Sequence, residues 1–360
     1  AMQSAKPGDT LVMQNGIWKD QKIIFEGNGT ENNPIVLMAE TPGSVILSGT
    51  SSLNMAGHWL EANGLVFRNG YIQKGSIVNF KNDKDSAYHC RLTNTVIEQY
   101  KAPNDTIETH WISLYGTHNR VDHCQLSGKS NEGTTLVVWL NGTPNYDRID
   151  HNHFGPRPPL GRNGGEIIRV GTSTWSMTNS YTTVEDNYFE KCDGEIEVIS
   201  NKSCHNIYRH NTFYACQGTL TLRHGNDVLV ENNFFFGNNE TESGGVRIIG
   251  AHHTVIHNYF QDLSGTGLRA AISVMNAQQH PALNGYWPVK DVTIADNVIV
   301  SCKQGIVMGS GAGERGRVMA PANCRIYGNK IFNKASPKAF SGVAVQPVTK
   351  ADTGPEWIVH

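Results

Sequence analysis

The sequence predicts an all-β protein, a right-handed parallel β-helix in which short strands wind into stacked coils. Composition is the first observation, because 37 of 360 residues are glycine and only 17% are charged, which favours turns and short strands over helices. The second and third are a repeated motif and the spacing of its copies. We expect one solenoid domain with inserted loops over residues 1–360; a two-sheet sandwich is the alternative, but it does not explain the repeat.

The repeated motif is an apolar or β-branched residue, two polar residues, an asparagine and further apolar residues. Its copies read IDHNHF, VEDNYF, IYRHNTF, VENNFF, VIHNYF, IADNVI and IYGNKI. Their asparagines are Asn152, Asn187, Asn211, Asn233, Asn258, Asn297 and Asn329. VDHCQL puts Cys124 in the same position, and weaker copies occur at Asn63 and Asn94.

Successive asparagines of the motif are separated by 35, 24, 22, 25, 39 and 32 residues. The smallest interval corresponds to one coil of a parallel β-helix, and the larger intervals imply loops inserted into a coil. An asparagine at a sharp turn can hydrogen-bond the backbone of the coils on either side. We therefore interpret these asparagines as structural rather than catalytic.

The remaining segments fit the same architecture in order along the chain. Residues 7–49 alternate short apolar runs with glycine-rich turns and read as the opening coils. The glycine-rich stretch GSGAGERG, which begins at Gly309, lacks the lysine and Ser/Thr of a phosphate-binding loop and is interpreted as a turn. The less regular end, from Ser336, is expected to form a final coil with a cap.

Global features exclude several function classes. The formal net charge of −2 gives no indication of nucleic-acid binding, and no apolar run is long enough for a membrane span. The opening residues show no recognisable secretion signal. The seven cysteines lack metal-site spacing and are expected to be mostly buried thiols, with one disulfide as the alternative.

The stretch GEIEVISNKS, residues 194–203, places two acids beside a lysine. Because side chains alternate along a strand, Glu195 and Glu197 should share a face, with Cβ atoms roughly 6–7 Å apart. Carboxylates this close repel each other unless a cation lies between them, and Ca²⁺ prefers such oxygen ligands. The alternative is a solvated acidic edge. Lys202 should lie just past the strand.

Neighbouring coils are expected to add further polar groups to this face. Aligning their glycines places Glu197, Thr221 and Arg247 in one column, with Arg223 further along its strand. Asn163 and Glu166 belong to the preceding coil. A local set of acids, an amide, a lysine and arginines indicates an acidic ligand.

Such a set suits β-elimination at a uronic acid. The C5 proton lies beside a carboxylate and becomes removable once a cation neutralises that carboxylate. A lysine near a cation and an arginine should have a lowered pKa and act as the base. Glycoside hydrolysis would instead need two carboxylates flanking the bond, without a metal.

These segments resemble polysaccharide lyase family six, the β-helix family of alginate lyases and chondroitinase B. The matching blocks are NGGEIIRVG (163–171), GEIEVISNKS (194–203), QGTLTLRHG (217–225) and GGVRIIGAHHTV (244–255). The resemblance implies calcium ligands at Asn163, Glu195 and Glu197. It also implies a base at Lys202 and an acid or charge stabiliser at Arg223.

Substrate contacts are expected from basic side chains around this cluster. The candidates are His224, Arg247, Arg269, Arg157 and Lys129, the last two being placed in inserted loops. His224 would instead point inward if its strand continues. Trp139 and Trp175 could stack on sugar rings, although packing in the core is the favoured interpretation.

The sequence is therefore interpreted as an alginate lyase that cleaves mannuronate-containing chains by calcium-assisted β-elimination, with endo action. The alternatives are a dermatan sulfate lyase like chondroitinase B, a pectate-lyase-like enzyme and a non-catalytic β-helix that binds polysaccharide. The expected partner is an acidic polysaccharide, with no nucleic acid and no membrane. A polymeric substrate implies a secreted or periplasmic protein.

Overall fold

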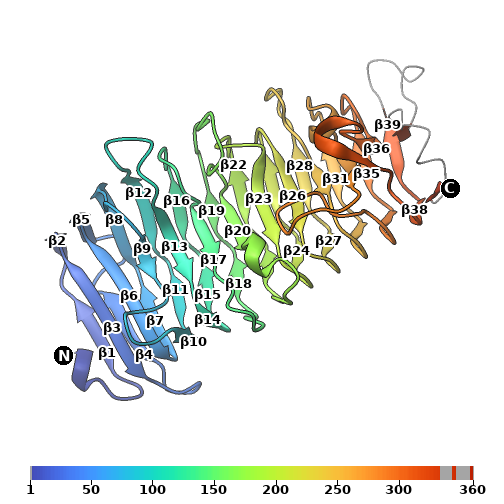
Figure 1. Ribbon diagram of the computed structural model, residues 1–360. Helices are drawn as coiled ribbons and strands as arrows, with labels where there is room; N and C mark the ends of the chain where they lie inside the picture. Colours follow the sequence, from blue (N-terminus) through green and yellow to red (C-terminus); the bar gives the residue numbers. More distant parts are fainter. Residues whose placement is uncertain (1, 333–342, 346–356, 360) are drawn as a thin grey trace.

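The computed structural model describes residues 2–332, 343–345 and 357–359, which form a right-handed parallel β-helix (Figure 1). The coils stack along one axis from the N-terminus to the C-terminus. Three long parallel sheets run the length of this stack, as expected from the repeat. Most of the final coil and cap expected from Ser336 lies outside the described residues.

Sheet A is 13-stranded within the described residues, and its order follows the sequence. Its strands are β1 (Thr10–Met13), β4 (Ile35–Ala39), β7 (Leu60–Asn63), β11 (Arg91–Thr93), β15 (Arg120–Asp122), β18 (Arg148–Asp150), β21 (Thr183–Glu185), β24 (Ile207–Arg209), β27 (Leu229–Glu231), β30 (Thr254–Ile256), β34 (Thr293–Ala295), β38 (Cys324–Tyr327) and β41 (Trp357–Val359).

Sheet B is 12-stranded within the same residues. Its strands are β2 (Gly16–Lys19), β5 (Val45–Gly49), β8 (Leu65–Gly70), β12 (Val96–Tyr100), β16 (Gln125–Ser127), β19 (His153–Phe154), β22 (Tyr188–Glu190), β25 (Thr212–Tyr214), β28 (Phe234–Phe236), β31 (Tyr259–Gln261), β35 (Val298–Val300) and β39 (Lys330–Phe332).

Sheet C, 14-stranded in the described part of the chain, carries the candidate site. Its strands are β3 (Lys22–Asn28), β6 (Ser52–His58), β9 (Ser76–Asn79), β10 (Ala87–Tyr88), β13 (His110–Leu114), β14 (Gly116–Thr117), β17 (Leu136–Val138), β20 (Ile168–Gly171), β23 (Glu197–Lys202), β26 (Thr219–His224), β29 (Val246–Ile248), β32 (Ile272–Met275), β36 (Ile306–Ser310) and β40 (Val343–Val345).

The other elements lie in loops. An antiparallel pair joins β33 (Ala277–Gln278) to β37 (Arg317–Met319). The 3₁₀ helices are η1 (Met2–Ser4), η2 (Ser173–Trp175), η3 (Gly267–Arg269) and η4 (Glu314–Gly316). The described residues contain no helix that is long enough to span a membrane.

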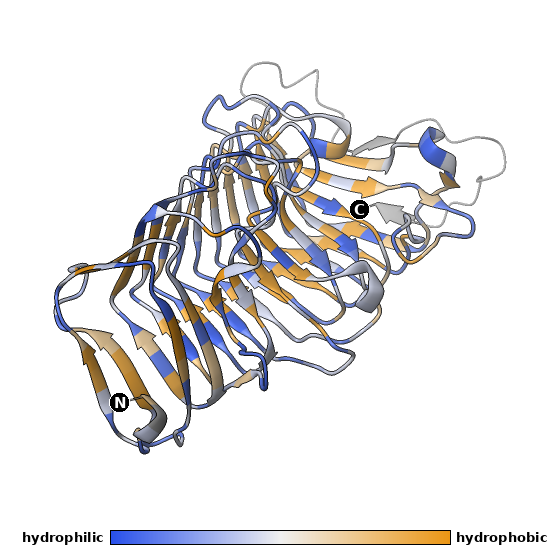
Figure 2. Cartoon of the chain, turned by 60° about the vertical axis from the view of Figure 1, so that its left-hand side comes forward, coloured by the Kyte–Doolittle hydropathy of each residue, from blue (hydrophilic) through white to orange (hydrophobic). Residues whose placement is uncertain are grey.

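The core fills the interior of the coils, where inward-facing apolar side chains of all three sheets meet. Figure 2 shows apolar and polar residues alternating along many strands, as the two-residue period of a strand requires. On sheet B, five phenylalanines stack ring on ring at centroid distances of 4.6–5.0 Å. They are Phe154, Phe189, Phe213, Phe235 and Phe260. Five successive coils thus bury the same side chain at this position of sheet B.

The recurring asparagines form a buried hydrogen-bonded ladder, which confirms their structural role. The Asn211 amide N–H and Nδ2 both donate to Asn233 Oδ1, each at 3.0 Å. Nδ2 also donates to the Val184 carbonyl at 2.9 Å. The same bonds repeat from Asn152 to Asn329. The ladder therefore ties each coil to its neighbours at one turn.

Of the three earlier positions that resemble the motif, only Cys124 belongs to the buried ladder. Cys124 holds the expected position, since its N–H donates to Asn152 Oδ1 at 2.9 Å. Asn63 and Asn94 do not belong to the buried ladder. Thr93, not Asn94, pairs with Asn63, and the two asparagines share an exposed hydrogen bond of 3.1 Å. The spacing of the apolar residues in the sequence did not show that Thr93, rather than Asn94, pairs with Asn63.

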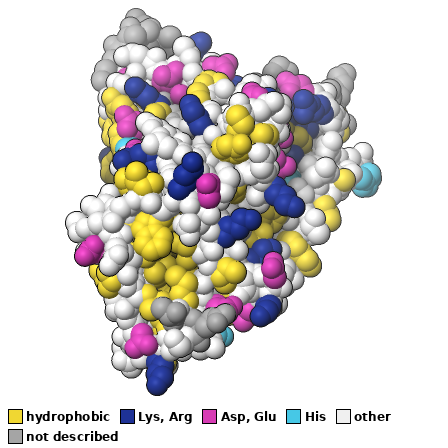
Figure 3. All heavy atoms as spheres, turned by 90° about the vertical axis from the view of Figure 1, so that its left-hand side faces the viewer, with side chains coloured by type: hydrophobic (Ala, Val, Ile, Leu, Met, Phe, Trp, Pro, Cys, Tyr) yellow, Lys and Arg dark blue, Asp and Glu magenta, His cyan; other side chains and the backbone are white. Residues whose placement is uncertain are grey.

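The thiols match the expectation for the cysteines, and charges of both signs lie at the N-terminal end. All seven cysteines are buried and free, as the odd number and spacing suggested. At the N-terminal end, positive and negative side chains are interspersed around apolar atoms (Figure 3).

Candidate functional site

The candidate site lies on the outward face of sheet C, over strands β20, β23, β26 and β29. The register places Arg169, Ser200, Thr221 and Arg247 side by side on successive coils. Glu197 is not in this column as expected, because an irregularity between Glu197 and Ile199 shifts the register and pairs Glu197 with Thr219. Glycine alignment could not reveal this extra residue.

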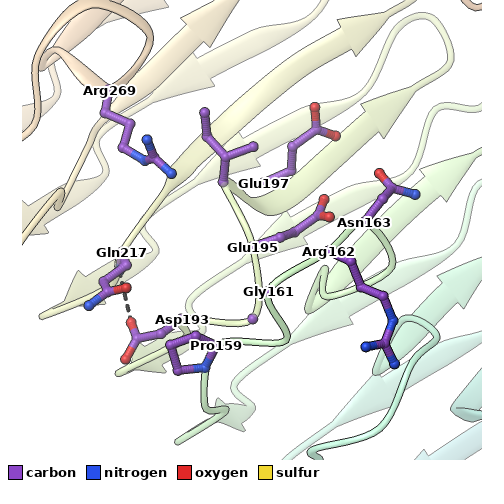
Figure 4. A pocket seen from close by; sticks show the side chains of 11 residues that line it. Pro159, Gly161, Arg162, Asn163, Asp193, Glu195, Glu197, Gln217 and Arg269 are labelled. Carbon is purple, nitrogen blue, oxygen red and sulfur yellow. Dashed lines mark hydrogen bonds between the residues drawn. The ribbon is translucent and has the colours of Figure 1, made fainter. Parts of the chain in front are cut away.

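Three carboxylates converge at the start of β23. One carboxylate oxygen from each of Glu166, Glu195 and Glu197 lies within 4.8 Å of the others. Glu195 precedes the strand, so the shared face expected from strand alternation is instead produced by the turn before β23. Figure 4 shows the side chains of Glu195, Glu197 and Asn163 directed to the same side.

A cavity of about 420 Å³ opens beside these carboxylates. Its lining residues are Pro159, Gly161, Arg162, Asn163, Asp193, Gly194, Glu195, Ile196, Glu197, Gln217 and Arg269. Arg269, expected to extend the groove, thus reaches the site from η3, where its Nη1 lies 3.3 Å from Glu242 Oε2. The three expected metal-ligating residues all line this cavity.

The carboxylates fit a hard divalent cation. Burial, together with the charges of Glu166 and Glu197, raises the pKa of Glu195 to about 8. Glu166 Oε2 is buried and has no hydrogen-bond partner. A buried acceptor without a partner and three crowded acids are costly alone, but both are satisfied by an oxygen-coordinated cation such as Ca²⁺. Glu166 was not among the expected ligands.

Glu197 is the best compensated of the three acids. Its Oε1 pairs with Arg247 Nη2, its Oε2 accepts from Ser200 Oγ, and Arg223 Nε lies 3.8 Å away. Burial acts to raise its pKa, but Arg247, Lys202 and Ser200 outweigh burial and lower it. Arg247 was expected to bind substrate; it is only 3% exposed, and its visible role is to hold Glu197 ionised.

Lys202 ends β23 and lies on the same face. Its Nζ is 4.0 Å from Glu166 Oε1, and its side chain is partly exposed. Lys202 on β23 and Arg223 on β26 thus lie on adjacent coils, as the one-coil interval predicted, and each lies within 4.0 Å of a carboxylate. This arrangement places an amine that can carry a proton beside the candidate metal ligands.

Arg223 is held from several directions near the end of β26. Its Nη1 donates to the Gly285 carbonyl at 2.8 Å and to His224 Nε2 at 2.9 Å. Its Nη2 donates to the Asn284 carbonyl at 2.9 Å. Because a guanidinium only donates, His224 Nε2 must accept. Burial, followed by the charges of Arg223 and Lys202, lowers the pKa of His224 to about 3, which keeps that ring neutral.

Sequence reasoning missed the loop that covers Arg223. The Tyr286 ring lies between two guanidinium groups, with Arg223 and Arg317 each 4.5 Å from its centroid. This loop joins β33 to β34 and is separated from Arg223 by about 60 residues of sequence. No repeat or motif linked it to the site, and only the folded coils bring it there.

Lys129 and Arg157 lie in loops between strands, as expected, but their side chains are buried and do not line the cavity. Both are 1% exposed, because they satisfy carbonyls beneath the site. Arg157 donates to the carbonyls of Glu166 at 2.7 Å and Gly164 at 3.1 Å, among others. Burial, followed by repulsion from Arg157, lowers the pKa of Lys129 to about 6. Arg157 therefore supports the loop from Asn163 to Glu166, whereas Lys129 donates to Asn131 and Glu132, and neither lines the cavity.

Neither tryptophan packs in the core. Trp139 is half-buried beside Arg169, whose Cζ lies 5.1 Å from the ring centroid. Trp175 is 37% exposed on η2 and does not line the cavity. Of the two, Trp139 lies on the same face as Lys202.

Comparison with known proteins assigns this chain to a family. The sequence profile described as Chondroitinase B matches residues 1–338. The solved structure of the alginate lyase AlyGC, of family PL6, is 39% identical with a TM-score of 0.88. That match covers 100% of this chain but 51% of AlyGC, so this chain spans about half the length of that relative.

Two further solved structures of family 6 lyases are similar to this chain. A mannuronic acid specific family 6 lyase from human gut microbiota is 34% identical over 98% of this chain and 80% of its own, with a TM-score of 0.87. The lyase Pedsa3628 from Pseudopedobacter saltans is 27% identical over 96% and 89%, with a TM-score of 0.78. No curated protein matched the sequence. With the β-helix, the acidic site and these matches, the chain belongs to polysaccharide lyase family 6.

Proposed function

We propose that this protein is a calcium-assisted alginate lyase that cleaves mannuronate-containing chains by β-elimination. The observation that carries the proposal is the convergence of Glu166, Glu195 and Glu197 beside Lys202 and Arg223. The family membership and the alginate lyases among its structural relatives support the substrate class.

Asn163, Glu195 and Glu197 would hold the calcium ion, with Glu166 as an additional carboxylate. A bound calcium ion would neutralise the substrate carboxylate and stabilise the negative charge that develops on it. Arg247 keeps Glu197 ionised, and Arg157 fixes the loop that carries Asn163 and Glu166. These contacts preorganise the carboxylate-binding end of the site.

Lys202, as the free amine, takes the C5 proton of the uronate through Nζ. The electron pair of that C–H bond forms the C4–C5 double bond while the bond from C4 to the glycosidic oxygen breaks. Arg223 lies beside this centre and stabilises the oxygen as it leaves; solvent supplies the proton that completes it. Two carbonyls and the neutral His224 orient the guanidinium for this task.

The described coils would act as one catalytic domain with endo action on the polymer. A polymeric substrate also supports a location outside the cytoplasm, secreted or periplasmic. The name of the matching profile makes dermatan sulfate the natural comparison substrate.

The test is the ultraviolet absorbance of the unsaturated uronate product. Mannuronate-rich alginate, guluronate-rich alginate and dermatan sulfate would be compared, with calcium and with a chelator. We expect activity on mannuronate-rich alginate, its loss in chelator, and a fall of about 10²–10⁴-fold in kcat for Lys202→Ala.

Lys330→Ala is the matched control, because Lys330 is an exposed lysine of sheet B. It should leave activity unchanged. Full activity of Lys202→Ala would contradict the base assignment, and product from dermatan sulfate alone would replace the proposed substrate. Binding without any product would favour a non-catalytic role.

A further inference from the structure

Two histidines lie side by side at the turn between sheets A and B, away from the acids of sheet C. The register pairs Asp122 at the end of β15 with Asp150 at the end of β18. The residues that follow, His123 and His151, therefore lie on adjacent coils. Their φ values are 52° and 55°, so the two turns share one left-handed backbone conformation. The same Asp-His pair is thus repeated on neighbouring coils.

The two imidazole rings are parallel and bonded in the same way. Their centroids are 5.1 Å apart and their planes differ by 7°. His123 Nδ1 lies 2.6 Å from Asp122 Oδ2, and His151 Nδ1 lies 2.8 Å from Asp150 Oδ2. The histidine side chains are 51% and 45% exposed. Since conformation and bonding repeat, the two Nε2 atoms project to the same side.

Arginines fix both carboxylates. Arg91 donates from Nε and Nη2 to the two oxygens of Asp122 at 2.7 and 2.6 Å. Arg120 bonds to Asp150 in the same way at 2.8 and 2.6 Å. Both carboxylates are fully buried. Because a carboxylate held by an arginine only accepts, each neutral imidazole donates its Nδ1–H and keeps the Nε2 lone pair for another partner.

A carboxylate that accepts from one imidazole nitrogen is the usual support for a histidine whose other nitrogen binds a metal. Imidazole suits Zn²⁺, Cu²⁺ and Ni²⁺, whereas the oxygen ligands near Glu195 suit Ca²⁺. Two bonds of about 2.0–2.1 Å to one zinc ion require the Nε2 atoms to lie within about 4 Å of each other. Half-exposed rings that are held only at Nδ1 can lean together to reach that distance.

Other histidines at the turns lack this combination. Four of them lie 3.7–3.9 Å from a carboxylate oxygen, which is beyond hydrogen-bond distance. They are His205, His210, His252 and His257. His89 and His118 stack at 4.6 Å, but neither pairs with a carboxylate of the described residues. Parallel rings and carboxylate support therefore occur together at His123 and His151.

We propose that His123 and His151 bind one divalent transition metal ion, of the zinc, copper or nickel class, through their Nε2 atoms. Water completes the coordination. Because the two ligands belong to different coils, the ion links those coils and stabilises the folded solenoid. The site is separate from the carboxylates of sheet C and does not rest on the proposed function.

The test is titration calorimetry of the tag-free protein with zinc chloride. Excess calcium would be present to suppress zinc binding at the carboxylates of sheet C. We expect one zinc ion per chain, and a Kd at least tenfold higher in His123→Ala and in His151→Ala. Electron paramagnetic resonance of the copper-loaded protein should show two coordinating imidazole nitrogens in the wild type and one in either variant.

His257→Ala is the matched control, because His257 is 52% exposed and follows the same strand of a later coil. It should keep the zinc affinity of the wild type. Equal zinc affinity in the wild type and both site variants overturns the inference, as does the absence of zinc binding in excess calcium. An equal loss in His257→Ala also overturns it, because binding would then be spread over the surface histidines.

Discussion

Replacing Arg157 by methionine should loosen the loop that carries the proposed metal ligand Asn163 without changing a residue that lines the cavity. The Arg157 guanidinium donates five hydrogen bonds of 2.7–3.2 Å, four to carbonyls and one to Thr135 Oγ1. Hydrogen bonds from a charged donor contribute about 1.5–3 kcal/mol each, but desolvation of the buried charge offsets much of that sum. We expect a net loss of about 3–5 kcal/mol in the free energy of unfolding.

The calcium affinity of Arg157→Met should fall by more than its lower stability alone explains. Two of the five bonds end on Gly164 and Glu166, within the loop that carries Asn163. Loss of a group that orients metal ligands typically lowers metal affinity about 10–100-fold. The assay is the melting temperature over a calcium series, which gives Kd through the linkage of ligand binding to stability.

Lys129→Met is the control for Arg157→Met. Lys129 is equally buried, but its Nζ donates to the Asn131 and Glu132 carbonyls and to Asn131 Oδ1, with no bond to the loop from Asn163 to Glu166. It should lose stability while keeping its calcium affinity. An unchanged calcium Kd in folded Arg157→Met would refute the reasoning.

Three further predictions concern the scaffold and the site. Asn211→Ala should lower the free energy of unfolding by about 2–4 kcal/mol, because the Asn187 N–H and the Val184 carbonyl lose their buried partners. Urea unfolding measures this loss. An unchanged unfolding midpoint would contradict the stabilising role of the ladder. Burial lowers the pKa of His253 to about 4, so the unfolded chain takes up its proton first as pH falls below about 6.5. His253→Gln should therefore reduce the stability lost between pH 7 and 5 by about 2 kcal/mol, and an equal loss in both proteins would exclude this histidine as the cause. Glu195 protonates more readily when folded, so its contribution to stability is lost as pH rises toward about 8. In chelator at pH 8, Glu195→Gln should raise stability by on the order of 2 kcal/mol while weakening calcium binding in calorimetry; a less stable variant would argue against repulsion among the acids.

The repeat made the fold predictable, because the same motif with its asparagine recurs on successive coils. Asn152 to Asn329 could be assigned to one turn from spacing alone, and the structure confirms the ladder. The acid pair and Lys202 were also readable, since they lie within eight residues of one another. Functional residues that lie close together in the sequence could therefore be predicted from the sequence alone.

Features that depend on irregularity or on distant loops could not be predicted. The shift after Glu197 moved that residue out of the column with Thr221, because one extra residue leaves no trace in composition. The burial of Lys129 and Arg157 depends on carbonyls of loops whose paths the sequence does not reveal. Tyr286 reaches Arg223 only through a long excursion between coils.

The asparagine ladder makes the stacking of the coils independent of the length of the loops between them. Adjacent ladder residues bond to each other whether they are 22 or 39 positions apart in the chain. An insertion between two of them therefore lengthens a loop without changing the register of the coils, whereas a single deletion within a strand would disturb every level it touches. Loops of different length can therefore be accommodated on this scaffold without a change in the stacking of the coils.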